Sequence, residues 1–365
     1  MYLENLIAGV EGTPSFDYYV KRDFNKMSGR TKRRIIWRPN ESAREIQNLL
    51  LDDLRSLDYG MPCATGSRKG CSYVENALAH RRSRFFYLLD LESAFPTITP
   101  EMATSVLCKI NSKLTGKETE VCAFLSRYCF LSPEMIEACR NQGVRIEPSG
   151  LMAKEIGGLI TGGPVAPYLF DLILAEMVDK PIEKLLFDYF NGKRGDWLYT
   201  RYIDDLTFSF PSHQIGRNPD LRKQIRLIIQ DAGFGISHHK AKLLDIRKGA
   251  IQITGVNLVL GRKGVHCKLS KTYLEGLRHF FFIAAKPDSD ITLSQVSGVW
   301  GAFYACLRRR HVPLSALEHE IIGSYNLCRA RLCKDKKSPK DPDPDWLAQL
   351  RKKLQKQNRR GQNLA

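Results

Sequence analysis

The sequence predicts a mixed α/β (α+β) fold, and three kinds of segment indicate it. Residues 84–91, RFFYLLDL, form an apolar run with the length and composition of a buried strand. Residues 198–210 are rich in β-formers on both sides of a polar centre, which predicts two strands around a tight turn. Residues 41–56 instead carry apolar side chains at helical spacing, and helical patterns recur over residues 101–144 and from residue 271 onward.

The N-terminal elements have local signals of their own. Residues 28–38 are strongly basic and then rich in β-formers, so we expect an exposed turn that runs into a strand. Residues 61–80 begin as a loop of Gly, Ser and Cys and end as a short helix. Residues 99–101 supply a capping Thr, a first-turn Pro and an acid, which together predict a helix start.

The C-terminal half continues the alternation of helix and strand. Residues 157–167 predict a Gly- and Pro-rich loop that opens a helix running to about Leu186. Residues 219–232 predict another helix, and residues 250–260 predict a strand. Residues 333–365 shift to Lys, Arg, Gln, Asp and Pro, which indicates a basic tail with one helical piece.

The composition indicates a basic globular protein. Lys and Arg total 56 against 39 Asp and Glu, and the resulting net charge of +17 favours a polyanionic partner. No apolar stretch reaches the roughly 20 residues of a membrane span, and the N-terminus lacks the basic cluster of a signal peptide. The ten cysteines include no CxxC pair. We therefore expect reduced thiols in a cytoplasmic protein rather than a zinc site.

Three carboxylates stand out in this pattern. Asp90 ends an apolar run, and the adjacent pair Asp204-Asp205 separates two predicted strands. Neighbouring carboxylates repel each other unless a cation neutralises them. A third acid from another strand would complete a hard oxygen site for Mg²⁺, and two such ions about 3.5–4 Å apart would activate a 3′-hydroxyl and stabilise pyrophosphate. An isolated Asp-Asp pair is also common in simple turns, so the pair alone leaves that interpretation open.

The segments around these acids resemble one family of enzymes. RYIDDLTFS resembles the catalytic YxDD box of reverse transcriptases, and its LTFS end is similar to retron enzymes. DLESAFPTI resembles the first catalytic box, which begins at Asp90. The other similar segments, in matching order between residues 30 and 260, are GRTKRRIIWRPNESAREIQ, NALAH, LITGGPVAPYLFD, GISHHKAK and ITGVNLV. The resemblance implies a right-hand polymerase with fingers, an antiparallel palm similar to an RNA-recognition motif, and a helical thumb.

The chain departs from this family near the loop that grips template and primer. Thr161 stands where glutamine is usual, Ala166 where serine is usual, and Asp171 where asparagine is usual. Ala94 replaces a frequent second aromatic residue. These changes affect template grip and product geometry rather than metal binding. They favour a divergent, defence-associated reverse transcriptase as an alternative to a standard retron enzyme.

The resemblance assigns the metal chemistry to a small set of residues. Asp90, Asp204 and Asp205 would hold two Mg²⁺ ions, with Mn²⁺ as a substitute. The Leu91 carbonyl would add a further ligand. Lys240 would donate a proton to the departing pyrophosphate or neutralise it, with a plain surface lysine as the competing interpretation.

Other residues are implied to contact the nucleotide. Phe95 would block a ribose 2′-hydroxyl and so favour dNTPs, with a core aromatic residue as the alternative. Gly162 and Gly163 would let the backbone approach nucleotide or template, although a helix-entry turn also explains them. Basic side chains on the fingers turn would clamp the triphosphate; they are Lys32, Arg33 and Arg34. Arg34 fits the family pattern best, and a solvated basic face explains the other two equally well.

A further group is implied to contact nucleic acid. Tyr202 is expected near the primer end, and Arg201 either pairs locally or touches phosphate. Asn76 and His80 lie four residues apart on one helical face, and the resemblance implies a structural or RNA-contacting role for both. An arginine cluster would end a thumb helix, where cations are favourable even without phosphate; its members are Arg308, Arg309 and Arg310.

The same resemblance divides the chain and suggests its activity. The expected parts are fingers (1–85), first palm strand (86–99), fingers and palm helices (100–150), palm (151–260), helical thumb (261–332) and basic tail (333–365). The expected activity is RNA-directed DNA synthesis from dNTPs on a structured noncoding RNA in the bacterial cytoplasm, within a retron or related anti-phage system that includes an effector or toxin protein. The alternatives are repetitive or untemplated DNA synthesis and a non-catalytic RNA-binding scaffold. The three intact acids argue against the scaffold, and the sequence does not predict the oligomeric state.

Overall fold

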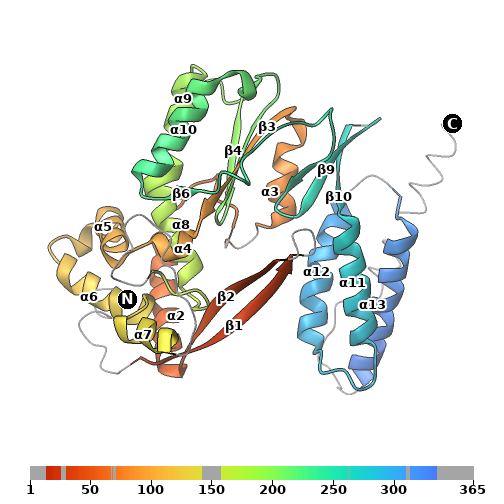
Figure 1. Cartoon of the computed structure of the whole chain (residues 1–365), viewed down its shortest axis with the longest axis horizontal. Helices are drawn as coiled ribbons and strands as arrows, with labels where there is room; N and C mark the ends of the chain where they lie inside the picture. Colours follow the sequence, from red (N-terminus) through yellow and green to blue (C-terminus); the bar gives the residue numbers. More distant parts are fainter. Residues whose placement is uncertain are drawn as a thin grey trace. The chain divides into compact units, whose positions relative to one another are not determined.

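The computed structural model describes residues 14–25, 30–66, 68, 71–141, 158–262, 264–309 and 313–334. The chain divides into two compact units (Figure 1). The first comprises Met1–Asn76 and Arg82–Asp245, and the second comprises Ala77–Arg81 and Ile246–Ala365. Each unit contains both sheets and helices, so the predicted mixed α/β class is confirmed.

The first unit is built on a sheet whose central strand carries Asp90. Its order is β4 (Leu198–Tyr202), β5 (Asp205–Phe210), β3 (Phe85–Glu92) and β6 (Gly235–Ile236), with β7 (Lys242–Asp245) also paired to β3. These strands pair antiparallel. From Leu206 to Phe210 every residue of β5 is buried. Because side chains alternate between the two faces of a strand, both faces of the sheet are covered here.

Helices cover this sheet and complete the core of the first unit (Figure 1). A helical run passes from α8 (Ala166–Leu174) through a π-helical segment, η3 (Ala175–Asp179), into α9 (Lys180–Tyr189). Helix α10 (Pro219–Asp231) starts where Asn218 accepts a hydrogen bond from the Leu221 N–H and Pro219 takes the first turn. Phe208 and Phe210 of β5 share one apolar core with Ile225 and Ile229 of α10.

The described residues up to 245 form further helices and strands. They are β1 (Phe16–Asn25), β2 (Arg30–Pro39), α2 (Glu41–Ser56), α3 (Tyr73–Ala79), η1 (His80–Arg82), α4 (Ala94–Thr97), α5 (Pro100–Ile110), η2 (Ser112–Leu114), α6 (Glu118–Cys129), α7 (Pro133–Asn141) and η4 (Ile215–Arg217). The predicted start of α5 is confirmed, because the Thr99 hydroxyl accepts from the Met102 N–H at 3.2 Å. Strand β1 was not predicted; among the described strands it pairs with β2 alone, so its conformation depends on that partner.

The second unit combines a small sheet with three described helices. The sheet order is β10 (Gly264–Leu269), β9 (Val256–Gly261) and β8 (Ile251–Ile253), and the helices are α11 (Lys271–Ala284), α12 (Leu293–Arg309) and α13 (Ala316–Lys334). The expected single strand over residues 250–260 is wrong. Thr254 and Gly255, both with positive φ, form a tight turn that splits it into a hairpin. The predicted helices from residue 271 are confirmed, whereas β10 lies at the start of the segment expected to be helical thumb.

A stacked aromatic pair anchors the helices of the second unit. The rings of Trp300 and Tyr325 stack with centroids 3.8 Å apart, and Phe281 packs edge-on against Tyr325. Within the described part of the chain, no helix has both the length and the apolar character required to cross a membrane.

Candidate active site

The pairing of β3 with β5 brings the predicted acids together. Asp90 lies directly opposite Asp205 in the antiparallel register, and residues opposed in this way have Cα atoms about 4.5–5.5 Å apart. The Leu91 N–H donates to the Asp204 carbonyl oxygen at 3.0 Å. Acids from segments more than a hundred residues apart in the sequence therefore meet at one end of the sheet.

The turn that carries the acid pair is strained. Tyr202 and Asp205 close β4 on β5, which leaves Ile203 and Asp204 as the two turn residues. Ile203 has a φ of 58°, a conformation that is unusual for a β-branched side chain and costs about 1–3 kcal/mol. A neighbouring loop approaches closely, since a Cβ atom on Gly66 would lie 2.6 Å from the Ile203 nitrogen. The surrounding structure must therefore hold this turn in place.

Lys240 contacts the acid cluster directly. Its Nζ donates to both carboxylate oxygens of Asp90, at 2.8 and 2.7 Å. The backbone reinforces this contact, because the Ser237 N–H donates to the Asp90 carbonyl oxygen at 2.9 Å and the Lys240 N–H donates to the Ser237 carbonyl. These contacts tie the turn that bears Lys240 to the end of β3. The role of Lys240 in catalysis stays a prediction.

The surroundings of Asp205 disfavour its ionisation. Burial first, and then the charges of Asp204 and Asp90, raise the pKa of Asp205 to about 7, while Lys240 opposes this shift. Additional positive charge at this end of the sheet would favour the fully ionised form.

The donor chemistry fits a divalent cation, although the side chains are not yet arranged around one. Among the described residues, no three His, Cys, Asp or Glu side chains converge closely enough to hold a metal ion. Asp90 and Asp205 lie opposite each other in the strand register, and their oxygens are the ligand type that Mg²⁺ prefers. A site that uses all three acids would need these side chains to converge more closely than they do here.

Phe95 lies in the short helix that follows β3. Its ring stacks on Phe170 of α8, with centroids 4.4 Å apart and planes 7° apart, and it remains partly exposed. Its carbonyl oxygen accepts from the Leu159 N–H at 3.1 Å. The packing role is therefore observed, and the role in sugar selection stays a prediction.

The two loop glycines have a packing reason of their own. Gly162 has a φ of 117°, and a Cβ atom there would lie 2.3 Å from the Trp37 carbonyl oxygen. A Cβ atom on Gly163 would lie 2.2 Å from Oε1 of the buried Gln47. Thr161 ties the same loop to β2, because the Trp37 N–H donates to its carbonyl and its hydroxyl donates to the Ile35 carbonyl. Contact of the glycines with nucleotide or template stays a prediction.

Asn76 and His80 are buried. The Asn76 Oδ1 accepts from the Thr65 hydroxyl at 2.9 Å, and neither side chain has measurable exposure. Burial lowers the pKa of His80 to about 3, so this ring is neutral at physiological pH. A side chain without exposed surface does not contact RNA, so the structure favours the structural alternative for both residues.

The remaining predicted contacts are only partly described. Tyr202 is half-buried beside Asp205, and burial, followed by the charge of Asp205, raises its pKa. Arg308 is exposed near the end of α12. For the other basic candidates, the side chains or whole residues lie outside the described residues; these are Lys32, Arg33, Arg34, Arg309, Arg310 and the tail from residue 335.

Arg201 pairs locally, which decides between the two alternatives for this residue. Its side chain has no measurable exposure, and its Nη2 lies 2.9 Å from Asp171 Oδ1 and 2.7 Å from Asp179 Oδ2. Removing one member of such a buried pair typically costs about 3–5 kcal/mol. Asp179 was not singled out from the sequence. It is one of four acids in the largely apolar run of residues 166–186, and because a buried charge requires a partner, these four were the candidates for pairing with Arg201.

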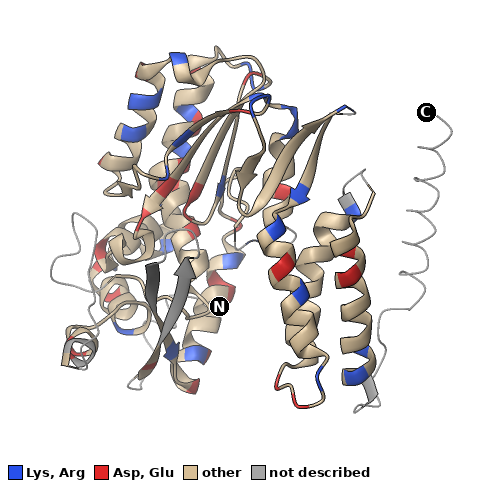
Figure 2. Ribbon diagram, turned by 45° about the vertical axis from the view of Figure 1, so that its right-hand side comes forward, with Lys and Arg blue, Asp and Glu red and all other residues tan. Residues whose placement is uncertain are grey.

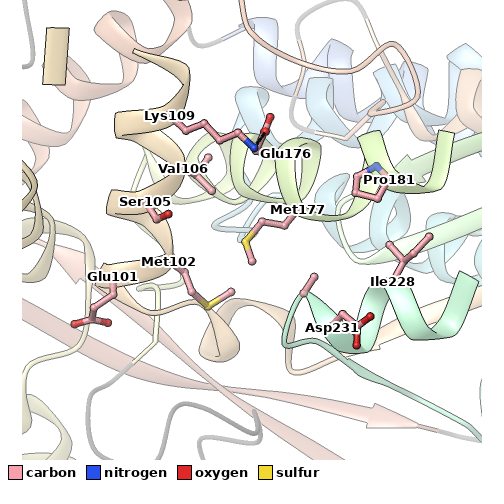
Figure 3. A pocket seen from close by; sticks show the side chains of 11 residues that line it. Glu101, Met102, Ser105, Val106, Lys109, Glu176, Met177, Pro181, Ile228 and Asp231 are labelled. Carbon is pink, nitrogen blue, oxygen red and sulfur yellow. Dashed lines mark ion pairs between the residues drawn. The ribbon is translucent and has the colours of Figure 1, made fainter. Parts of the chain in front are cut away.

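A separate cavity of about 650 Å³ opens between α5, η3 and α10 (Figure 3). Lys109 and Glu176 form an ion pair of 2.5 Å at its edge. Although burial raises the pKa of Glu176, hydrogen bonds from Lys109, Lys180 and Tyr59 hold it at about 2. No residue of the acid cluster lines this cavity, so it is distinct from the candidate metal site.

An antiparallel sheet that presents carboxylates at a hairpin turn, flanked by helices, has the architecture of the palm of a right-hand polymerase. A comparison with protein families identifies which one. Residues 21–258 match the family "Reverse transcriptase (RNA-dependent DNA polymerase)". The chain therefore belongs to the reverse transcriptase family.

Curated relatives include retron enzymes. The chain is 26% identical over 216 residues to the retron Ec83 reverse transcriptase of Escherichia coli, which covers 59% of this chain and 54% of that protein. It is 27% identical over 253 residues to the retron Mx65 reverse transcriptase of Myxococcus xanthus, covering 67% and 52%. The chain thus spans about half the length of these two relatives. A solved telomerase from Candida albicans, in complex with a fragment of telomeric RNA, aligns with a TM-score of 0.46 and 12% identity, covering 93% of this chain and 57% of that one.

Replacement of Gly162 by alanine tests the packing of the loop against β2. We expect Gly162→Ala to lower the free energy of unfolding by more than about 2 kcal/mol, because it adds a backbone clash to the strain of a positive φ. Gly116→Ala is the matched control, since Gly116 also has a positive φ but a Cβ atom there would meet no other atom within 4 Å. Urea unfolding measures both, and equal losses would contradict the proposed clash.

The buried His80 predicts a pH-dependent stability. Its folded pKa of about 3 lies below the usual value of about 6.5. Between these two pH values the unfolded chain binds a proton at His80 and the folded chain does not. The free energy of unfolding therefore falls as the pH drops below about 6.5, by up to about 1.4 kcal/mol per pH unit. Urea unfolding between pH 7 and 5 should show this slope. His80→Asn should reduce it, and His279→Asn, at an exposed position, should leave it unchanged; a slope insensitive to His80 would contradict the assignment.

Proposed function

We propose that this chain is an RNA-directed DNA polymerase that copies a partner noncoding RNA by two-metal nucleotidyl transfer. The observation that carries the proposal is the placement of Asp90 opposite Asp205, beside the turn residue Asp204. Membership of the reverse transcriptase family supports the class of reaction. The retron reverse transcriptases among the relatives support a retron-type setting. Within it, we propose an anti-phage role with an effector or toxin protein as a further partner.

The residues at the sheet end suggest a division of labour. Two Mg²⁺ ions, or Mn²⁺ as a substitute, would activate the primer hydroxyl and stabilise the departing pyrophosphate. Carboxylate oxygens would come from Asp90 on β3, Asp205 on β5 and Asp204 in the turn between β4 and β5. The Leu91 carbonyl would be a further ligand. Lys240, once released from Asp90, presents an ammonium group that can neutralise or protonate the leaving oxygen.

The charge of the chain supports a nucleic-acid partner. The net charge is +17, and Lys and Arg occur on helices of both units (Figure 2). Arg308 is exposed near the end of α12, where a phosphate contact would add to the local helix-end stabilisation. The bacterial retron enzymes among the relatives support the bacterial cytoplasm as the proposed location, a compartment in which thiols are kept reduced.

A second candidate is synthesis of repetitive or untemplated DNA. The observation that favours it is the loop at residues 158–165, where the Thr161 hydroxyl is engaged by the Ile35 carbonyl at 2.9 Å. Ala166, which begins α8, is buried and has no polar side-chain atom. Neither residue offers a free polar side chain to a template, unlike the glutamine and serine that are usual there. Sequencing the DNA product against the co-purified RNA separates the two candidates.

The double substitution Asp204→Asn with Asp205→Asn tests the proposed chemistry. We expect DNA synthesis to fall to background because the amides bind divalent cations far more weakly than carboxylates do. The fold should survive, and the free energy of unfolding should hold or rise because the raised pKa of Asp205 shows that its charged form is disfavoured. dNTP incorporation with and without co-purified RNA, together with urea unfolding, measures both effects.

The exposed Asp188 at the end of α9 provides the control for that experiment. Asp188→Asn removes one negative charge without touching the acid cluster, so synthesis should stay at the wild-type level. Wild-type incorporation by the double variant would exclude the proposed site. Incorporation that is absent from the wild-type chain in every RNA and metal condition would exclude the polymerase activity itself.

Replacement of Phe95 by alanine tests sugar selection. If the ring occupies the space that a 2′-hydroxyl needs, Phe95→Ala should raise rNTP incorporation relative to dNTP by removing a steric penalty. Phe170→Leu is the matched control, because it removes the same ring stack but leaves the Phe95 ring in place. Competition between dNTP and rNTP measures the preference. If an active Phe95→Ala enzyme keeps the wild-type preference for dNTP over rNTP, Phe95 has a packing role and no role in sugar selection.

A further inference from the structure

A fully buried arginine, Arg201, contacts the turn that carries the acid pair. The Nε of Arg201 donates to both oxygens of Asp179, at 2.9 and 3.0 Å, and Nη2 donates to Asp171 Oδ1 at 2.9 Å. The Tyr199 hydroxyl donates to the same Asp179 carboxylate at 2.7 Å. Burial alone lowers the pKa of Arg201, but the charge of Asp179 and then of Asp171 raises it above its ordinary value. The guanidinium therefore stays charged and fixed in place.

The π-helical segment explains how two acids of one helical run reach the same guanidinium. Asp171 and Asp179 are eight residues apart, which separates them by about 80° around a regular α-helix with 3.6 residues per turn. The Lys180 N–H instead donates to the Ala175 carbonyl, a bond that spans five residues. This wider turn takes up an extra residue and brings the two acids toward one face. Single-turn π segments are frequent at functional sites.

The remaining guanidinium nitrogen reaches the strained turn. Nη1 donates to the Ile203 carbonyl at 3.2 Å, and Ile203 is the residue with the positive φ immediately before Asp204. The backbone of Arg201 is also fixed, because its N–H donates to the Cys63 carbonyl and its carbonyl accepts from the Thr65 N–H, each at 2.8 Å. Strained residues persist only where their surroundings over-determine them, and these contacts supply that constraint.

We propose that Arg201, anchored by Asp171 and Asp179, is a positioning residue that holds the strained Ile203 turn and so sets the aim of Asp204 and Asp205. The inference rests on the proposed function, since it concerns the same metal-binding acids. The Arg201 side chain is fully buried, so it acts on the turn rather than on substrate or metal. It acts through its hydrogen bond to the Ile203 carbonyl, which only a planar, multiply donating side chain can make while also holding two carboxylates.

The test replaces Arg201 by lysine and measures metal binding directly. Lysine keeps the positive charge but cannot bridge Asp171, Asp179 and the Ile203 carbonyl at once. We expect Arg201→Lys to weaken Mn²⁺ binding to the full chain by roughly tenfold to a hundredfold, the usual effect of removing a group that orients metal ligands. Electron paramagnetic resonance measures this binding. In primer extension the kcat should fall while the KM for dNTP changes little.

A second substitution distinguishes positioning from general destabilisation. Asparagine tolerates a positive φ better than isoleucine does, so Ile203→Asn should restore part of the Mn²⁺ affinity to the Arg201→Lys chain. Asp179→Asn, which leaves Arg201 in place but loosens its anchor, should weaken Mn²⁺ binding in the same direction and serves if Arg201→Lys does not fold. Arg84→Lys, which alters the separate Arg84–Asp245 ion pair of the same sheet, and the core variant Ile229→Val are the controls.

The outcomes separate this inference from the proposed function. Equal Mn²⁺ affinities in Arg201→Lys and the two controls, or no recovery with Ile203→Asn, would show that the arginine network only stabilises the fold. A wild-type chain that binds Mn²⁺ but incorporates no dNTP would defeat the proposed function while the loss of affinity in Arg201→Lys still supported positioning. Weakened binding that Ile203→Asn partly restores is the result that the proposal requires.

Discussion

The antiparallel pairing of β3 with β5 places two carboxylates opposite each other, and the chemistry proposed for the first unit depends on that register. Asp90 and Asp205 face each other in register, and the pKa of Asp205 rises to about 7 because burial and its acidic neighbours disfavour its charge. A one-residue slip of either strand would move these side chains to opposite faces of the sheet. The aromatic and aliphatic core of β5 therefore fixes the chemistry as well as the fold, since it pins the register.

The buried acids Asp171 and Asp179 and the acid cluster at Asp90 are neutralised by different kinds of cation. Asp171 and Asp179 are compensated by Arg201, which is buried, charged and held from several sides. Asp90 is compensated by Lys240, whose side chain is 47% exposed. An exposed, flexible ammonium can leave its partner at little cost, whereas a buried guanidinium cannot. We therefore expect the Asp171–Arg201–Asp179 contacts to persist during function. We expect Asp90 to be able to exchange the Lys240 ammonium group for a metal ion.

The parts of this arrangement that depend on local sequence were predictable. The apolar run ending at Asp90 and the break at Asp204-Asp205 indicated the strands and the turn, because burial and turn chemistry act over a few residues. The sequence offered four acids in residues 166–186 but did not indicate which two of them pair with Arg201, since the pairing depends on a π segment that the sequence does not mark. Thr254 was also missed as a turn residue, because threonine rarely adopts a positive φ. Contacts between residues far apart in the sequence, such as Thr161 with Ile35, cannot be predicted from the periodicity of apolar residues.

The loop at residues 158–165 links β2 to the segment that follows Asp90 by hydrogen bonds to the main chain. On one side Thr161 exchanges hydrogen bonds with β2, and on the other the Leu159 N–H donates to the Phe95 carbonyl. Phe95 lies five residues after Asp90 in the segment that leaves β3, and its ring stacks on α8. Arg201 contacts Asp171, the residue after Phe170 in the same helix, so adjacent residues of α8 contact Phe95 and the arginine that binds the Ile203 carbonyl. We therefore expect substitutions in the loop to affect the acids through this chain of contacts, even when no altered side chain touches a nucleotide.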